Sequence, residues 1–285
     1  MNPGQLAYTA CLWEATARKV GNVHRQRDFP DLRYTDFVRS ATAIAPVFAR
    51  ALQQTVGDTI LEAIQATRQT VRTNTNLGMV LLLAPLATVE PGEPWAQGLE
   101  RVLNSLDMAE SRKVFAAIRL AQPGGLGQSP QQDVHAEPTL PLRAIMALAA
   151  ERDLVARQYA NGYREVLDEG VPCLTRHLSQ VMDIERAIIL THLDFLARHP
   201  DSLILRKRGL QRAQEVSRRA AKVLATSEPD RQRAIAELDD WLHAKRLNPG
   251  TSADLLAGCL FIALRDGIVT KEDWNMESLG CEPLA

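Results

Sequence analysis

The stretch Lys-Val-Gly-Asn-Val-His-Arg-Gln-Arg-Asp at residues 19–28 gathers cations, an imidazole and a carboxylate into ten positions of an otherwise helical pattern. Such a composition makes a poor hydrophobic core and a poor helix, and it is typical of a loop that meets a polyanion. A solvated surface loop is the structural alternative. The candidate phosphate-binding residues are Lys19, Gly21, Asn22, His24 and Arg25.

Three more polar breaks lie directly before or beside apolar helical runs, at residues 73–78, 123–127 and 248–254. A helix N-terminus offers free backbone amides and the positive end of the helix dipole, which suit a phosphate. Helix capping is the structural alternative, with Ser252 and Asp254 capping a helix that begins near Leu255. The binding candidates from these breaks are Asn74, Thr75, Asn76, Gly78, Gly124, Gly125, Asn248, Gly250, Thr251 and Ser252.

Two carboxylates beside these breaks could serve a metal ion. Asp254 could hold Mg²⁺ or orient a hydroxyl, since Mg²⁺ binds through one or two carboxylates together with substrate phosphates. Asp133 follows the glycine-rich loop and is the second candidate. Arg206 and Lys207 could neutralise phosphates, and Asp201 before them could simply be a helix N-cap. The histidines lack a zinc-binding spacing, and no P-loop or Gly-x-Ser-x-Gly motif is present.

The composition is that of an ordinary soluble globular protein. The chain has 285 residues, of which 46% are hydrophobic and 24% charged, and its net charge is −1. We expect no binding to nucleic acid, because the net charge is near zero and the Arg-rich stretch 206–222 has no interleaved aromatics. We expect no membrane span, no signal peptide and a cytoplasmic location. The cysteines are scattered, which argues against disulfides: Cys11, Cys173, Cys259 and Cys281.

The apolar spacing predicts an all-α protein. Residues 37–52, 145–166, 183–197 and 255–263 repeat apolar side chains at helical spacing, and 183–197 is apolar nearly all round, as in a central buried helix. No stretch alternates with a period of two. We predict a single compact domain over residues 1–285, with about ten helices and a long loop at 122–141.

With these motifs in this order, the chain resembles the triphosphoribosyl-dephospho-CoA synthase family. The resemblance is strongest to a divergent branch of the family found in archaea and one-carbon-metabolising bacteria. The motifs that carry the resemblance are Glu14 with 19–25, Asp28-Phe-Pro-Asp31, 73–78, 123–127 with Gln132-Asp133-Val134, Ala149–Asp153, Gln158-Tyr159, 201–207 and 248–254.

The resemblance implies an all-α transferase of cofactor biosynthesis. Studied members join ATP to 3′-dephospho-CoA: a ribose hydroxyl of dephospho-CoA displaces adenine from C1 of the ATP ribose. The product is the precursor of an acyl carrier protein prosthetic group. The resemblance further implies that carboxylates hold Mg²⁺ or activate the hydroxyl, with Asp133 and Asp254 as the metal ligands. The catalytic candidates are Glu14, Asp31, Asp133 and Asp254.

The chain departs from the family pattern within the expected pocket. Arg18-Lys19-Val20-Gly21 stands in place of Pro-Lys-Pro-Gly, His24 stands near a usual aspartate, and the Gly-Gly-Leu-Gly loop replaces an Arg-Gly-Glu motif. Two alternatives therefore stay open. One is an ATP-using phosphotransferase or condensing enzyme in biosynthesis of a one-carbon carrier cofactor of the methanopterin or methanofuran type. The other is a non-catalytic, nucleotide-binding helical module. The expected partners are a nucleotide and a small-molecule acceptor, and a homodimer is one option.

Overall fold

Two helices that are apolar on nearly every side lie at the centre of the fold. In α4 (Leu77–Ala87), every residue except Gly78 is buried. In α14 (Gly250–Arg265), all residues between the first and the last are buried except Asp254, which is half-buried. A helix that is hydrophobic all round must be covered by other elements. The two pack against each other, and α1 (Pro3–Thr16) packs against both.

The structure is a computed structural model and describes residues 1–125, 127, 129 and 131–274. This part of the chain contains fourteen α-helices and no β-strand, so the all-α prediction is confirmed. The other helices are α2 (Tyr34–Phe48), α3 (Val56–Thr70), α5 (Trp95–Asn104), α6 (Met108–Ala121), α7 (Leu142–Ala149), α8 (Leu154–Asn161), α9 (Val171–Val181), α10 (Ile184–Arg198), α11 (Ser202–Arg208), α12 (Leu210–Ala225) and α13 (Asp230–Ala244).

The expected number of about ten helices was too low, and the segment 145–166 shows why. It is not one helix: α7 ends at Ala149, and α8 begins only after Asp153, whose carboxylate accepts from the backbone N–H groups of Val155 and Ala156. Gly162 then ends α8 in the left-handed conformation, with φ 75°. Caps therefore divide a periodic apolar pattern that continues across the breaks.

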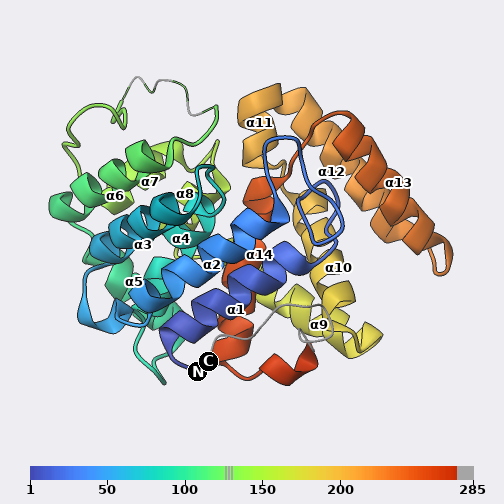
Figure 1. Ribbon diagram of the computed structural model, residues 1–285, viewed down its shortest axis with the longest axis horizontal. Helices are drawn as coiled ribbons and strands as arrows, with labels where there is room; N and C mark the ends of the chain where they lie inside the picture. The colour runs from blue at the N-terminus through green and yellow to red at the C-terminus, as the bar shows by residue number, and fades with distance from the viewer. Residues whose placement is uncertain (126, 128, 130, 275–285) are drawn as a thin grey trace.

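The helices form two groups around α14. Figure 1 shows α3, α5, α6 and α7 on one side of it and α10 to α13 on the other, with α1 and α2 crossing in front. The larger hydrophobic core joins α1 to α8 with α14, and a smaller core fills the space between α10, α12 and α13. The helix predicted at 183–197 is confirmed as α10, with Asp183 as its N-cap.

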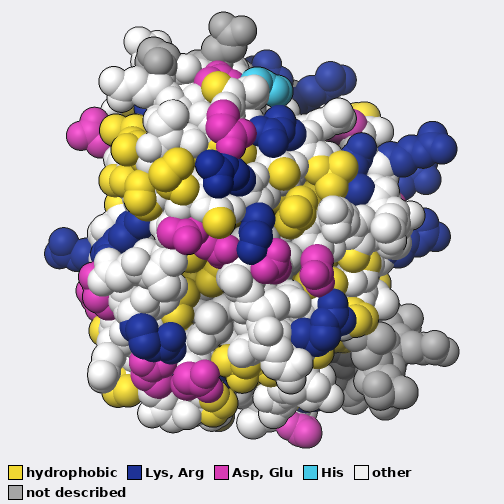
Figure 2. Space-filling view, turned by 90° about the vertical axis from the view of Figure 1, so that its left-hand side faces the viewer, with side chains coloured by type: hydrophobic (Ala, Val, Ile, Leu, Met, Phe, Trp, Pro, Cys, Tyr) yellow, Lys and Arg dark blue, Asp and Glu magenta, His cyan; other side chains and the backbone are white. Residues whose placement is uncertain are grey.

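The surface is mixed in charge where the first group faces solvent. On the face shown in Figure 2, Lys and Arg side chains are interspersed with Asp and Glu, and hydrophobic side chains gather in patches between them. Within the described ranges, no helix is long and apolar enough to cross a membrane. Cys11, Cys173 and Cys259 are buried free thiols, while Cys281 and the end of the predicted domain at residues 275–285 lie outside the described residues.

We predict that Leu83→Ala lowers the free energy of unfolding by about 2–5 kcal/mol, because Leu83 is fully buried in α4 and its loss leaves a cavity. Leu210→Ala is the matched control: that leucine is 52% exposed, and we expect a change within about 0.5 kcal/mol. Urea titration followed by circular dichroism measures both. Equal effects of the two substitutions would contradict the central position of α4.

Candidate functional site

A cavity of about 750 Å³ opens between the ends of the helices in the two groups. Its size lies in the range of small-molecule sites. All four carboxylates proposed as catalytic from the sequence line it: Glu14, Asp31, Asp133 and Asp254. It is also lined by most of the proposed binding residues, namely Asn22, Asn74, Thr75, Asn76, Gly78, Gly124, Arg206, Lys207, Asn248, Gly250 and Thr251. Segments far apart in sequence thus share one cavity.

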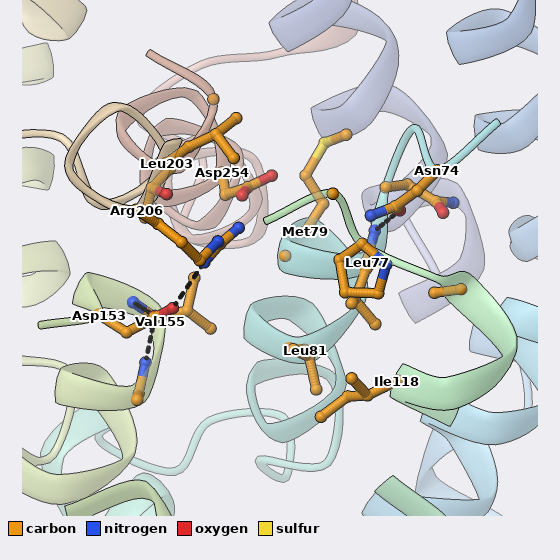
Figure 3. Close-up of a pocket in the computed structure, with 18 of the residues that line it drawn as sticks. Asn74, Leu77, Met79, Leu81, Ile118, Asp153, Val155, Leu203, Arg206 and Asp254 are labelled. Atoms are coloured by element: carbon orange, nitrogen blue, oxygen red, sulfur yellow. Dashed lines mark hydrogen bonds and ion pairs between the residues drawn. The ribbon is translucent and has the colours of Figure 1, made fainter. Parts of the chain in front are cut away.

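Asp254 lies against the first turn of α4. A Cβ atom added to Gly78 would stand 2.0 Å from Oδ2 of Asp254, so only glycine leaves room for this carboxylate. The structural alternative, in which Ser252 and Asp254 cap a helix beginning near Leu255, is wrong, because α14 already begins at Gly250. The carboxylate instead projects from the second turn of α14 into the cavity, where Figure 3 shows it between Arg206 and Met79.

Glu14 forms a buried ion pair with Lys19 at the same end of the cavity. The Lys19 Nζ atom lies 3.0 Å from Glu14 Oε1, and it also donates to the backbone carbonyls of Glu14 and Ala17. Lys19 is fully buried and does not line the cavity. The structure therefore does not support direct binding of a phosphate by Lys19. Its charge instead compensates the Glu14 carboxylate, as burial of that carboxylate requires.

Both carboxyl groups hold their protons more firmly than usual. Burial raises the pKa of Glu14, and the nearby Lys19 ammonium opposes the shift. Burial also raises the pKa of Asp254 well above its ordinary value, and the charges of Glu14 and Asp201 raise it further. Arg206 offsets part of this effect. Glu14 and Asp254 are thus two interacting acids of which only Glu14 has a close cation.

Two asparagine side chains present carbonyl oxygens that no neighbour uses. The Nδ2 group of Asn22 donates to Oδ1 of Asn248 at 2.9 Å, and that of Asn76 donates to the Thr67 hydroxyl at 2.9 Å. In the described part of the chain, the Oδ1 atoms of Asn22 and Asn76 are buried without a hydrogen-bond partner. A buried, unpaired acceptor is costly, so these oxygens are suited to ligand hydroxyl or amino groups. Asn76 is the N-cap residue of α4 but makes no side-chain cap bond, and Oδ1 of Asn74 accepts from the Leu77 N–H group at 3.2 Å instead.

Asp201 fixes the N-terminus of α14 from behind the cavity. Its Oδ1 atom accepts from the N–H groups of Leu203 and Ile204 and caps α11. Its Oδ2 atom accepts from the N–H group and the hydroxyl of Ser252, at 2.8 and 3.0 Å. Ser252 is therefore fully buried outside the cavity lining and does not reach a phosphate, contrary to the prediction. The clamp places Thr251 and Asp254 toward the cavity.

The glycine-rich loop meets the basic end of α11. Gly124 and Gly125 pack against the stem of Lys207: an added Cβ would stand 3.3 and 3.1 Å from its Cε and Cγ atoms. Gly124 lines the cavity, whereas Gly125 (φ 77°) does not. Arg206 Nη1 lies 3.4 Å from Asp153 Oδ2, and its Nε atom is buried without a partner. This end of the cavity combines two cationic side chains with close approach of the backbone.

Three binding candidates from residues 19–28 hold this loop in place and do not line the cavity. Arg25 donates from both terminal nitrogens to Glu185, each at 2.9 Å, so its predicted role as a phosphate ligand is not supported. The Gly21 N–H group donates to Asp239 at 2.7 Å. His24 is buried, and burial lowers its pKa to about 4, which leaves it uncharged near neutral pH. Gly21, His24 and Arg25 lie outside the cavity lining and position Asn22, which lies within it.

Four charged lining residues were not proposed as site residues: Arg68, Arg72, Arg152 and Asp153. Arg152 and Asp153 belong to a motif that carried the family resemblance, so that signal was available. Arg68 lies in the last turn of α3, and Arg72 follows four residues later, just beyond the end of the helix. Nothing in the local sequence distinguishes these two arginines from solvated surface arginines.

The candidate metal ligands lie in one cavity but do not form a preformed metal centre. Among the described side chains, no group of three or more His, Cys, Asp or Glu residues could hold a metal ion. Asp133 accepts from the N–H groups of Ser129 and His135, and the hydrogen bonds from His135 and Ser129 lower its pKa. An ionised Asp133 and the uncompensated Asp254 fit a Mg²⁺ ion that arrives with substrate phosphates.

Comparison with known proteins decides the family. A family model described as ATP:dephospho-CoA triphosphoribosyl transferase matches residues 1–272. The chain belongs to this family. It is 28% identical over 244 residues to a Pseudomonas syringae protein assigned as a 2-(5″-triphosphoribosyl)-3′-dephosphocoenzyme-A synthase, covering 78% of this chain and 76% of that one.

A second relative, the enzyme of this name from Pectobacterium atrosepticum, is 36% identical over 98 residues; the match spans 34% of this chain and only 32% of the relative. The structure also resembles a crystal structure from Archaeoglobus fulgidus assigned as a triphosphoribosyl-dephospho-CoA synthase. The TM-score is 0.66 at 26% identity, over 81% of this chain and 99% of that one. Transferase chemistry in coenzyme biosynthesis is what these relatives share.

We predict that Asp254→Asn makes the protein more stable at pH 8 in the absence of substrates. A carboxyl group whose pKa is raised on folding stabilises the native state while it is protonated, and this contribution is lost as pH rises through the folded-state pKa. The variant should therefore gain stability over the wild type between about pH 4 and pH 8, and the gap should close in acid. Urea unfolding across this range measures it. A variant that is less stable at pH 8 would contradict the uncompensated charge, and Asp168→Asn, at an exposed position outside the cavity, is the control.

Proposed function

We propose that this chain is a triphosphoribosyl transferase that displaces adenine from ATP with a ribose hydroxyl of 3′-dephospho-CoA. One observation carries the proposal: carboxylates, unpaired amide oxygens and cations from opposite ends of the sequence line a single cavity. The family model and the names of the relatives specify this reaction class. The same cavity supports nucleotide binding as part of the proposal, since a triphosphate needs cations and ribose hydroxyls need acceptors.

The two buried acids suit different parts of this reaction. Asp254, whose pKa burial and like charges raise, is the better base, because a base works best when its pKa lies near the working pH. We assign it the proton of the attacking hydroxyl. Glu14, paired with the Lys19 ammonium at 3.0 Å, would stabilise the positive charge that develops at the ribose C1 carbon as adenine leaves. The unpaired oxygens of Asn22 and Asn76 would accept from ribose hydroxyls of the two substrates and so orient the reacting groups.

Mg²⁺ belongs to the proposal as a companion of ATP. Asp133 would hold it together with the triphosphate, and the ion would supply charge neutralisation there, while Asp254 is left to the attacking hydroxyl. Arg206 and Lys207 would bind the remaining phosphate oxygens. A cytoplasmic location and a role in one-carbon metabolism stay predictions from the sequence.

Release of free adenine tests the reaction directly. We expect the purified protein to form adenine from Mg-ATP only when dephospho-CoA is present, as measured by chromatography. Asp254→Asn and Glu14→Gln should each lower kcat by about 100-fold or more, because each removes a charge used in the transition state. Asp168→Asn should leave the rate unchanged. Formation of ADP or AMP with no adenine would favour the phosphotransferase or condensing alternative.

The pH dependence of kcat/KM tests the assignment of the base. Activity should fall as pH falls, with a midpoint above the ordinary 3.8 of an aspartate, because protonated Asp254 cannot accept the hydroxyl proton. The residual activity of Asp254→Asn should not show this fall at low pH. That result would distinguish protonation of Asp254 from protonation of the substrate phosphates, which the variant still binds. An unchanged fall in the variant would assign the base elsewhere.

A further inference from the structure

Arg68 and Arg72 lie at the end of the cavity where α3 and α6 finish together. The two helices run side by side in the same direction: near their beginnings, the Gly57 N–H group donates to Glu110 at 2.5 Å, and Lys113 pairs with Asp58 at 2.7 Å. Their last turns therefore lie together, and Arg68 and Ile118 both line the cavity there. Figure 3 shows Asn74 and Ile118 on one side of the cavity and Arg206 with Asp153 on the other, with Asp254 and Met79 between.

These two arginines have no acidic partner in the part of the chain that the structure describes. Arg68 donates to the backbone carbonyl of Arg72, which joins the two residues, and neither guanidinium lies within ion-pair distance of a carboxylate. Arg206 at the opposite end, in contrast, pairs with Asp153. An unpaired guanidinium can bind an anion bidentately without first giving up a carboxylate.

The adjoining segment adds buried polar groups that also lack partners. The Thr73 hydroxyl is buried without a hydrogen bond among the described residues, and so is Oδ1 of Asn76, whose residue is only 3% exposed and lines the cavity. The Thr73 hydroxyl can donate to a phosphate oxygen, and Asn76 can accept from a neighbouring hydroxyl. The arginine pair and these two groups together form an anion subsite beside a hydroxyl-binding position.

An apolar wall leads away from this subsite toward solvent. It is built by α6 and α7 and consists of Phe115, Ile118, Leu142, Ile145, Met146 and Leu148. Leu148 lines the cavity and is 45% exposed, so the wall continues to the molecular surface. The face in Figure 2, on the side where Figure 1 places α6 and α7, carries hydrophobic patches of this kind. A ligand held here would carry an anionic group and a flexible, largely uncharged arm.

We propose that Arg68 and Arg72 bind the diphosphate of the acceptor nucleotide, while its pantetheine arm runs along the α6–α7 wall. Arg206 and Lys207, across Asp254, then hold the triphosphate of ATP. Two polyanions in one cavity need separate cationic sites. Figure 3 shows Asp254 between Arg206 on one side and Asn74 with Ile118 on the other, and in this arrangement Asp254 would face the acceptor hydroxyl and the ATP ribose. The assignment rests on the proposed triphosphoribosyl transfer.

Substitution of each cationic site should affect one substrate. We expect Arg68→Gln and Arg72→Gln to raise KM for dephospho-CoA about tenfold or more, with KM for ATP within about twofold, since each removes a charge-assisted hydrogen bond. Arg206→Gln should show the opposite pattern. The exposed Arg164→Gln, outside the cavity, is the matched control. An equal rise in KM for ATP and for dephospho-CoA in the Arg68 and Arg72 variants would overturn the assignment.

Calorimetric binding to Asp254→Asn tests the subsite without turnover. Dephospho-CoA should bind more tightly than ADP, which lacks the arm. Ile118→Asp should remove this advantage while leaving ADP affinity within about twofold, because it places a charge in the apolar wall. Equal binding of dephospho-CoA and ADP by the unsubstituted wall would contradict the arm's placement. If the wild-type protein releases no adenine and yet shows these binding differences, the proposed reaction fails and the subsite stands.

Discussion

The buried ion pair between Glu14 and Lys19 is the interaction on which the site depends. Burying a carboxylate is costly without a compensating charge, and Lys19 supplies that charge just beyond the end of α1, with Nζ held by backbone carbonyls as well. This contact fixes where the following loop begins. Asn22 then reaches Asn248 at the start of α14, and the first and last parts of the chain meet at the cavity.

Asp254 stands in contrast, because it has no ion-pair partner among the described residues and Arg206 offsets its charge only in part. Burial and the neighbouring carboxylates raise its pKa, so ionisation of Asp254 costs the native protein stability. Such stored cost is common where a side chain is kept for chemistry rather than for stability. Gly78 leaves the space for it, and the Asp201–Ser252 clamp holds the helix that carries it.

The fold could be predicted wherever one local signal was strong. The segment 183–197, which is α10, was predicted because it is apolar on nearly every side, as a buried helix must be. The segment 255–263, which lies in α14, was predicted from its apolar spacing. The segment 145–166 was predicted wrongly as one helix, since the Asp153 cap and the turn at Gly162 depend on local hydrogen bonds that the apolar period hides. The pair Arg68 and Arg72 could not be found, because only packing of α3 on α6 directs it into a cavity.

By itself, the sequence determined the helical class, the family and the residue types that a nucleotide site requires, since these follow from composition, period and motif. Only the tertiary structure decided which charged side chains face the cavity. Arg25 looked like a phosphate ligand until folding brought it to Glu185, 160 residues away, whereas Arg68 has no carboxylate partner among the residues that the structure describes. The physical reason is that a charge binds whichever opposite charge lies nearest in space, and for a buried ion pair that neighbour is set by the packing of distant helices.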